Sequence, residues 1–550
     1  MRYAAASALV GALLLTSASA GATTGSSTAQ DAAVTSSSTL HAAATTSPAQ
    51  DAAVTSAPGA GPTSPADARP RIAPLTSPLG RVADAPLPDR PTLAVHLSEE
   101  LGSRWLGPGN RRAITVRDAL TGQSLADRNS DRLMTPASTA KLLAAAAIVT
   151  GLPAEQTFTT RVVQGEEPGQ VVIVAGGDML LADGTGDPEA VAGHAGIADL
   201  AAQTAAALRG ETQAGTSGTT GSAMGAEDTA GATGGAAGDT AGATGEAGGA
   251  AGDPAAATVA PHDGPVTVAL DLSHVAGPHA MPTWSEHWVR EGWTGRIVQL
   301  GRSVDRALPY NPSPSSPEQE VARVFREALE DQGIEVTGAG DEDTRAAEVT
   351  AAEGAPLLAE VESAPLRDVL ALALATSDNA MVEQLARQAA VADGATADQA
   401  AVTAWITRSM TEDYGIDMTG MRVADASGLS DGTHLSMRAV ADVLVAGADG
   451  SHPALQEVLA GGGLPIAGYT GTLGNGMRFH LPVHAPAVGN ARAKTGTLPG
   501  VTALAGTVVT ADGRLLVFAV AADRVGDGAA ALEAASAVDE VVAELARCGC

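Results

Sequence analysis

Residues 138–141 read Ser-Thr-Ala-Lys, and residues 494–497 read Lys-Thr-Gly-Thr. These two tetrapeptides hold the only two lysines of the 550-residue chain, and every other permanently basic residue is an arginine. Lysine, unlike arginine, can lose its proton inside a protein and act as a base. A composition rich in alanine and glycine explains why lysine is rare, but it does not explain why both lysines stand in these motifs.

Ser138 stands where a buried helix is predicted to begin, because Pro136 precedes it and an Ala/Leu run follows. On a helix, the Ser138 hydroxyl and the Lys141 amine lie on one face, one turn apart. A lysine can take the proton of a serine nucleophile if burial or another cation lowers the lysine pKa, and a helix N-terminus favours negative charge that develops nearby. Alone, Ser-x-x-Lys also fits an N-cap serine followed by a surface lysine.

Residues 377–379 read Ser-Asp-Asn and follow an apolar, helix-like segment at 366–375. The Ser377 hydroxyl can carry a proton between a lysine and a leaving amine, and the Asn379 amide can both donate to and accept from a peptide. An isolated Ser-Asp-Asn would instead be read as a helix cap or an Asx turn.

The Lys-Thr-Gly-Thr motif directly precedes a β-prone run at 501–509. On a strand, Thr495 and Thr497 share a face, so two hydroxyls and the Lys494 ammonium can meet a substrate carboxylate. Gly496 allows the backbone to approach closely, and the backbone N–H groups of Thr497 and Ser138 can form an oxyanion hole. A lone exposed motif of this kind would more often be a turn.

Three such motifs in this order, with both lysines inside them, are poorly explained by independent chance. The chain resembles the serine penicillin-recognising enzymes, whose motifs these are. The gap between Ser138 and Ser377 exceeds two hundred positions, enough for an inserted domain, whereas class A β-lactamases place the motifs much closer. The long gap resembles the D-alanyl-D-alanine carboxypeptidases/endopeptidases of the penicillin-binding protein 4 type, the class C low-molecular-mass penicillin-binding proteins.

Further segments extend the resemblance over about residues 90–550. They are Ala-Gly-Gly-Asp at 175–178, Asp-Ala-Ser-Gly-Leu-Ser at 425–430, Leu-Pro-Ile-Ala-Gly at 464–468, Gly-Thr-Leu at 471–473 and Arg-Ala-Lys-Thr-Gly-Thr-Leu at 492–498. Glu383 also fits the pattern, with a salt bridge or a helix-face position as the alternative to a catalytic role. The chain departs from the pattern at Met179, where a proline is expected after Gly-Gly-Asp.

The resemblance implies an α/β fold, in which a transpeptidase/β-lactamase-like domain with an antiparallel sheet flanked by helices is interrupted by a large, mostly β inserted region. It implies a serine DD-peptidase that cleaves D-Ala-D-Ala ends or D-amino-acid crosslinks of peptidoglycan stem peptides, with β-lactam antibiotics as covalent inhibitors and no cofactor. The implied roles are nucleophile for Ser138, base for Lys141, proton shuttle for Ser377, substrate amide contact for Asn379, and carboxylate and oxyanion contacts for Lys494, Thr495, Gly496 and Thr497.

The chain is predicted to divide into five parts. A charged start, an apolar run at 8–15 and Ala-Ser-Ala at 18–20 indicate a signal peptide. The parts are a signal peptide (1–20), a disordered Ala/Thr/Ser/Pro-rich tether (21–90), the first part of the transpeptidase-like domain (91–158), an insert (159–357) and the second part of that domain (358–550). The insert includes a low-complexity tract at 210–260 that lacks the Gly-Lys-Ser/Thr element of phosphate loops.

Local patterns predict several elements. The predicted elements are strands at 171–174 and 266–270, a helix at 318–332, a hairpin of strands at 501–509 and 514–522, and a final helix at 529–547.

Composition excludes some classes of function. A net charge of −30 argues against nucleic-acid binding, and the histidines show no metal-ligand spacing. No stretch after the signal has the roughly 20 apolar residues of a transmembrane helix, so we expect a secreted, cell-wall-associated protein without an integral span.

Cys548 and Cys550 can be oxidised or free. Ser427 lacks the Gly-x-Ser-x-Gly elbow and is a poor rival nucleophile. A serine β-lactamase or esterase and a noncatalytic peptidoglycan-binding protein remain alternatives.

Overall fold

The computed structural model describes residues 85–211, 261–338, 344–474, 476 and 478–549. The predicted signal peptide, nearly all of the predicted tether and nearly all of the low-complexity tract lie outside the described residues. No helix in the described part of the chain is long and apolar enough to cross a membrane.

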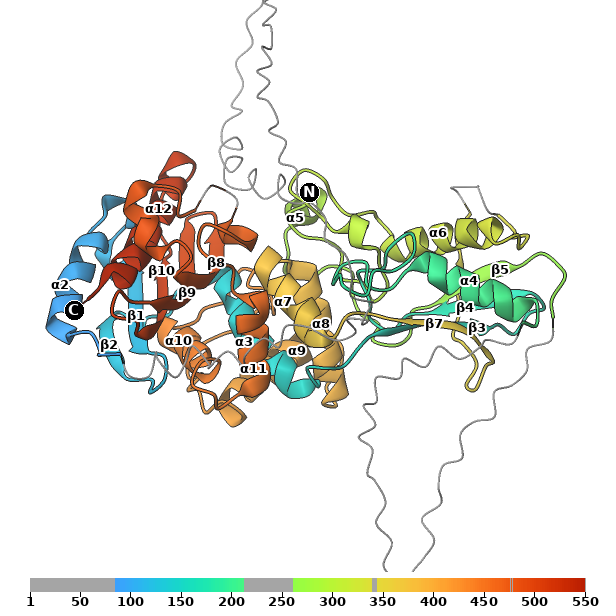
Figure 1. The fold of residues 1–550 in the computed structure, drawn as a ribbon, viewed down its shortest axis with the longest axis horizontal. Coiled ribbons are helices and arrows are strands. Elements are labelled where there is room, and N and C mark those ends of the chain that lie inside the picture. The colour runs from blue at the N-terminus through green and yellow to red at the C-terminus, as the bar shows by residue number, and fades with distance from the viewer. Residues whose placement is uncertain (1–84, 212–260, 339–343, 475, 477, 550) are drawn as a thin grey trace, which may run out of the picture.

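Two five-stranded sheets stand at opposite ends of the molecule (Figure 1). The first is antiparallel throughout, in the order β2-β1-β10-β9-β8. Its strands are β1 (Arg112–Asp118), β2 (Ser124–Arg128), β8 (Ala491–Leu498), β9 (Val501–Val509) and β10 (Leu515–Ala522). The predicted hairpin of β9 and β10 is confirmed, and β1 pairs with β10 across some four hundred residues of chain.

Helices cover both faces of the first sheet. Apolar side chains of α2 (Arg90–Glu100) and α12 (Ala529–Arg547) pack on one face, and α12 confirms the predicted final helix. Cys548, just after α12, is disulfide-bonded. The opposite face meets a helical layer, which consists of α3 (Lys141–Gly151), α7 (Leu366–Thr376), α8 (Asn379–Ala392), α9 (Gln399–Glu412), α10 (Met437–Ala446) and α11 (Pro453–Val458).

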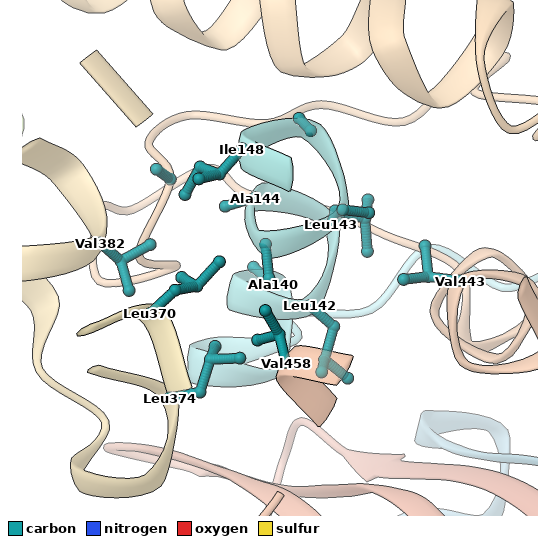
Figure 2. Close-up of a cluster of buried hydrophobic side chains, with 14 of the residues drawn as sticks. Ala140, Leu142, Leu143, Ala144, Ile148, Leu370, Leu374, Val382, Val443 and Val458 are labelled. Atoms are coloured by element: carbon teal, nitrogen blue, oxygen red, sulfur yellow. The ribbon is translucent and has the colours of Figure 1, made fainter. Parts of the chain in front are cut away.

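Helix α3 is the centre of that helical layer. Its residues from Lys141 to Ile148 are all buried, as expected for a helix that is hydrophobic on every side. Figure 2 shows its side chains surrounded by apolar residues of neighbouring helices, among them Leu370, Leu374, Val382, Val443 and Val458. The segment that carries the first sequence motif is therefore anchored in a closely packed core.

The second sheet is mixed, in the order β6-β5-β4-β3-β7. β3 runs antiparallel to β4 and β7, while β4, β5 and β6 are parallel. Its strands are β3 (Thr159–Gln164), β4 (Gln170–Val174), β5 (Thr267–Asp271), β6 (Ala347–Glu348) and β7 (Leu357–Glu362). β4 and β5 confirm the predicted strands near 171 and 266.

Two helices, α4 (Ile197–Leu208) and α6 (Pro317–Asp331), pack their apolar sides on this sheet. A short helix, α5 (Glu286–Arg290), lies in the loops that face the first unit. α6 confirms the predicted helix at 318–332. The α/β fold class holds, but the insert is itself α/β rather than mostly β, because its sheet needs α4 and α6 to cover one apolar face.

The boundaries at residues 158 and 357 remain predictions. Because β7 pairs with β3 from Thr159↔Glu362 onwards, we propose that the insert extends through Glu362 instead of ending at residue 357.

Candidate active site

The Ser138 turn is held in an unusual backbone conformation. A 3-10 turn at Ala137–Ala140 leads into α3, and Ala137 has a φ of 48°, a left-handed value that non-glycine residues rarely adopt. Gly428 packs against this turn, since a Cβ at Gly428 would lie 2.1 Å from the Ala137 carbonyl oxygen. Only glycine allows that approach, so the loop at 425–430 supports the turn that presents Ser138.

The Lys141 amine is fully buried and has three polar partners. Its Nζ lies 3.0 Å from Ser138 Oγ, 2.6 Å from Asn379 Oδ1 and 2.8 Å from the Ser427 carbonyl oxygen. A neutral amine has two N–H groups and one lone pair. It can donate to the amide and carbonyl oxygens and accept from the Ser138 hydroxyl, as a base must, whereas the protonated amine can donate to all three partners.

Burial lowers the pKa of Lys141 to about 8, and the opposing charges of Asp425, Glu383 and Asp378 keep it from falling further. A base with a pKa near the working pH combines a useful neutral fraction with real proton affinity. Burial therefore supplies the lowered pKa that a lysine needs to act as the base at this position.

Two buried carboxyl groups hold the loop that supplies the Ser427 carbonyl. Asp425 accepts from the backbone N–H of Gly428 at 2.6 Å, from the Ser427 hydroxyl at 3.1 Å and from Trp284 Nε1 at 2.8 Å. Glu383 accepts from the Ser427 N–H at 2.9 Å, and burial together with Asp425 raises the pKa of Glu383 to about 8. The Ser427 hydroxyl thus donates to Asp425 within its own loop, which leaves Ser427 a poor rival nucleophile.

The Ser-Asp-Asn motif is a helix junction and part of the site at once. Ser377 ends α7 with a φ of 59°, and Asp378 caps α8 by accepting from the Met381 N–H at 3.0 Å.

The sharp turn directs the Ser377 and Asn379 side chains to different lysines. Asn379 faces Lys141 and donates through Nδ2 to the Trp293 carbonyl oxygen at 3.2 Å, whereas Ser377 Oγ accepts from Lys494 Nζ at 2.8 Å.

Arg306 connects the insert to this junction. Its guanidinium forms an ion pair of 2.6 Å with Asp378. Burial alone would raise the pKa of Asp378, but the charge and hydrogen bonds of Arg306 hold that pKa below its usual value.

Strand β8 forms the opposite wall. Lys494 is fully buried, and its Nζ contacts Ser377 Oγ and, at 3.0 Å, the Thr495 carbonyl oxygen. Burial lowers the pKa of Lys494 well below its usual value, and the charge of Lys141 adds to this effect.

The next two residues of β8 make close contacts of their own. Thr495 Oγ1 donates to Thr472 Oγ1 at 3.0 Å, and a Cβ on Gly496 would lie 2.6 Å from the Pro136 carbonyl oxygen.

The backbone of β8 is open along part of its outer edge. The Ala493 N–H donates to the Pro465 carbonyl at 3.0 Å, on the side away from β9. Because alternate residues of a strand direct their amides to the same side, the N–H groups of Thr495 and Thr497 also face away from β9. Thr497 itself is exposed, which leaves its amide and hydroxyl accessible.

Direct side-chain hydrogen bonds join Ser138 and Asn379 to Lys141, and Ser377 to Lys494. Thr495, Gly496 and Thr497 follow on the same strand, and the oxyanion pair of Ser138 and Thr497 stays a prediction. In the described part of the chain, no group of His, Cys, Asp and Glu is placed to hold a metal ion. Sequence reasoning assigned no role to the Ser427 carbonyl, Asp425, Arg306, Trp293 or Thr472; the quoted segments at 425–430 and 471–473 were the available signal for three of them.

The sequence profile of the D-Ala-D-Ala carboxypeptidase 3 (S13) family matches residues 97–233 and 250–545, which include all three motifs. The chain belongs to this family. Carboxypeptidase DacB of Mycolicibacterium smegmatis is 32% identical over 495 residues, covering 88% of this chain and 89% of that protein. A D-alanyl-D-alanine carboxypeptidase of Actinomadura is 29% identical over 460 residues, covering 77% of this chain and 80% of that protein.

The fold is similar to the crystal structure of penicillin binding protein 4 (dacB) from Haemophilus influenzae, with a TM-score of 0.54 and 17% sequence identity over 78% of this chain and 93% of that one. These findings confirm the predicted resemblance to the penicillin-binding protein 4 type. As a member of the D-Ala-D-Ala carboxypeptidase family, this chain is a serine-type hydrolase, as predicted.

Proposed function

We propose that the protein cleaves peptidoglycan stem peptides after a D-alanine through an acyl-enzyme on Ser138. The observation that carries this proposal is the 3.0 Å contact between Ser138 Oγ and the buried Lys141 amine, whose pKa is lowered to about 8. The surroundings of Ser138 thus favour proton removal from its hydroxyl.

In the acylation step, Lys141 Nζ takes the proton of Ser138 Oγ while the oxygen attacks the carbonyl carbon of the penultimate D-alanine. The N–H groups of Ser138 and Thr497 stabilise the oxyanion. The C–N bond then breaks, and the leaving amine receives the proton from Lys141 through Ser377, whose hydroxyl lies against Lys494. Water, deprotonated by Lys141, hydrolyses the ester and restores the serine.

Substrate recognition falls to the two walls of the cleft. Asn379 contacts the peptide amide, and Thr495 and Thr497 bind the terminal carboxylate, with Lys494 adding positive potential from beneath. Gly496 leaves room for the backbone. β-Lactam antibiotics acylate the same serine because their ring amide meets the same groups, and such a substrate places the working enzyme outside the cytoplasm at the cell wall.

Mapping the adduct of a labelled penicillin by mass spectrometry tests the proposal. We expect one label, on Ser138 in the native protein, and none in Ser138→Ala, which should also fail to release D-alanine from a pentapeptide. Ser98→Ala, on the distant helix α2, is the matched control and should label normally. A label on Ser427, or D-alanine release by Ser138→Ala, would overturn the nucleophile assignment.

Digestion of defined monomeric and crosslinked muropeptides then divides the activity between carboxypeptidase and endopeptidase. Release of D-alanine from monomers reports the first, and conversion of dimers into monomers reports the second.

A further inference from the structure

A polar cavity of about 240 Å³ lies where the insert meets α8. Gln384 and Arg387 line it from α8, and Gly277, Ser316, Glu318 and Gln319 line it from the insert. One water needs only about 10–15 Å³ of such volume, so the cavity has room for a small organic ligand. It shares no residue with the proposed catalytic set.

The guanidinium of Arg387 is the cavity's most unusual group. Arg387 is 2% exposed, and Nη2 donates to the Pro278 carbonyl at 2.9 Å. Within the described ranges, Nε has no hydrogen-bond partner, and Nη1 makes only a long hydrogen bond of 3.4 Å to Gln384 Oε1. Glu383, on the same helix, acts on the guanidinium by its charge, but the pKa of Glu383 is itself raised to about 8. Because a buried cation that is incompletely compensated is costly, the site favours an anionic group.

The chain around Arg387 supplies a second free donor and the space for a ligand. Gln384 is fully buried, and its Nε2 lacks a partner among the residues that the structure covers. It lies three residues before Arg387, on the same face of α8. Gly277 borders the guanidinium so closely that a Cβ there would lie 2.6 Å from Arg387 Cζ.

The insert contributes charged groups of both signs to the lining, Glu318 and Glu348 together with His279 and Arg345. The first turn of the 15-residue helix α6 reaches the cavity at Ser316 and Gln319, and its N-terminal dipole also favours an anion. Glu318, in the same turn, is 3% exposed and lies 3.2 Å from His279 Nε2. A buried carboxylate beside free N–H donors matches a ligand that carries both an ammonium and a carboxylate.

We propose that this cavity binds a small free amino acid, whose carboxylate contacts Arg387 and Gln384 and whose ammonium contacts Glu318. D-Alanine is the probe, because the proposed reaction releases it; binding itself does not require Ser138. Asn379 and Glu383 lie on the same helix as Arg387, so the cavity borders a helix that also carries active-site groups.

Isothermal titration of the full-length protein with D-alanine tests the site. We expect one binding event, retained in the active-site variant Thr495→Val and weakened at least about tenfold, or 1.4 kcal/mol, in both Gln384→Glu, which repels a carboxylate, and Gly277→Val, which displaces the guanidinium. Acetate carries only the carboxylate of D-alanine, and methylamine carries only its ammonium. Each should therefore bind at least about tenfold more weakly than D-alanine.

Circular dichroism identifies any variant that fails to fold, and Glu318→Gln then provides an independent check, because it should weaken D-alanine binding while acetate binding is kept. Absence of D-alanine binding, unchanged binding in the folded cavity variants, or loss in Thr495→Val alone overturns the proposal. Failure of Ser138 labelling with an intact titration would instead count only against the proposed catalytic function.

Discussion

The two lysines of the chain lie in contrasting electrostatic settings. One stands on the helical wall of the site, formed by α3 and α8, and the other stands on strand β8. Lys141 on the helical wall and Lys494 on β8 are both fully buried. Three carboxyl groups oppose the effect of burial on Lys141 and leave its pKa at about 8. No carboxylate does so for Lys494, whose pKa is pushed down by burial and by the charge of Lys141.

The comparison shows that burial alone does not define a catalytic lysine. The helical wall combines burial with counter-charges and with three oxygen partners that fit both protonation states of the amine, so Lys141 can exchange its proton repeatedly. On β8, the amine has two acceptors, Ser377 Oγ and a backbone carbonyl, and is suited to orienting Ser377. The predictions below test this division of roles.

The largest effect is expected for Lys141→Arg. Because arginine stays protonated, the variant loses the base, and the acylation rate should fall by about 10²–10⁴-fold. Stopped-flow measurement with a fluorescent penicillin gives that rate. A loss below about tenfold would remove Lys141 as the base.

Lys494→Met should have a smaller effect, because it removes a hydrogen bond from an amine and some positive potential but leaves the base in place. We expect a decrease of about 10- to 100-fold in acylation, the value of one hydrogen bond to a charged group. The same assay measures it. A loss equal to that of Lys141→Arg would contradict the proposed difference between the walls.

The pH dependence should follow Lys141 in the native protein. With a pKa of about 8, its neutral fraction is about one tenth at pH 7 and one half at pH 8, so acylation should rise about tenfold from pH 7 to a plateau above pH 9. The rate increases with pH because deprotonation creates the base. A profile that is flat over this range would show that another group controls the step.

Arg306→Ala tests stability instead of the acylation rate, and it acts on the helical wall from the insert. It leaves Asp378 without its cation, and we expect the free energy of unfolding to fall by about 3 kcal/mol, the lower end for a broken buried pair, since both partners are largely buried. Arg323→Ala, which breaks more exposed pairs within α6, should cost about 0.5 kcal/mol. Urea unfolding compares them, and equal losses would mean that Arg306 has no special part in the junction.

Local elements were predictable where one pattern dominates. The β-branched run of β9 matched its predicted limits, and the amphipathic α6 differed from its prediction by one residue at each end. Sheet order was not predictable in the same way, because the pairing of β1 with β10 joins distant segments. The helices of the insert were underestimated, since the alanine-rich α4 has little periodic contrast.

The site shows the same division. Ser138, Lys141, Ser377, Asn379 and Lys494 were found because their side chains form short motifs. The Ser427 carbonyl was missed, since any residue type can offer a backbone oxygen. Arg306 was missed because an ion pair with Asp378 depends on how the insert packs, which no local pattern encodes.

The covered edge of β8 has a consequence for solubility. Exposed sheet edges invite pairing between molecules, and proteins often protect them with lysine, which this chain cannot do with two buried lysines. The segment at 465–467 occupies the edge through the amide of Ala493 and the carbonyl of Ala491. Only a short part of this edge stays open, so β8 offers little template for edge-to-edge pairing between molecules.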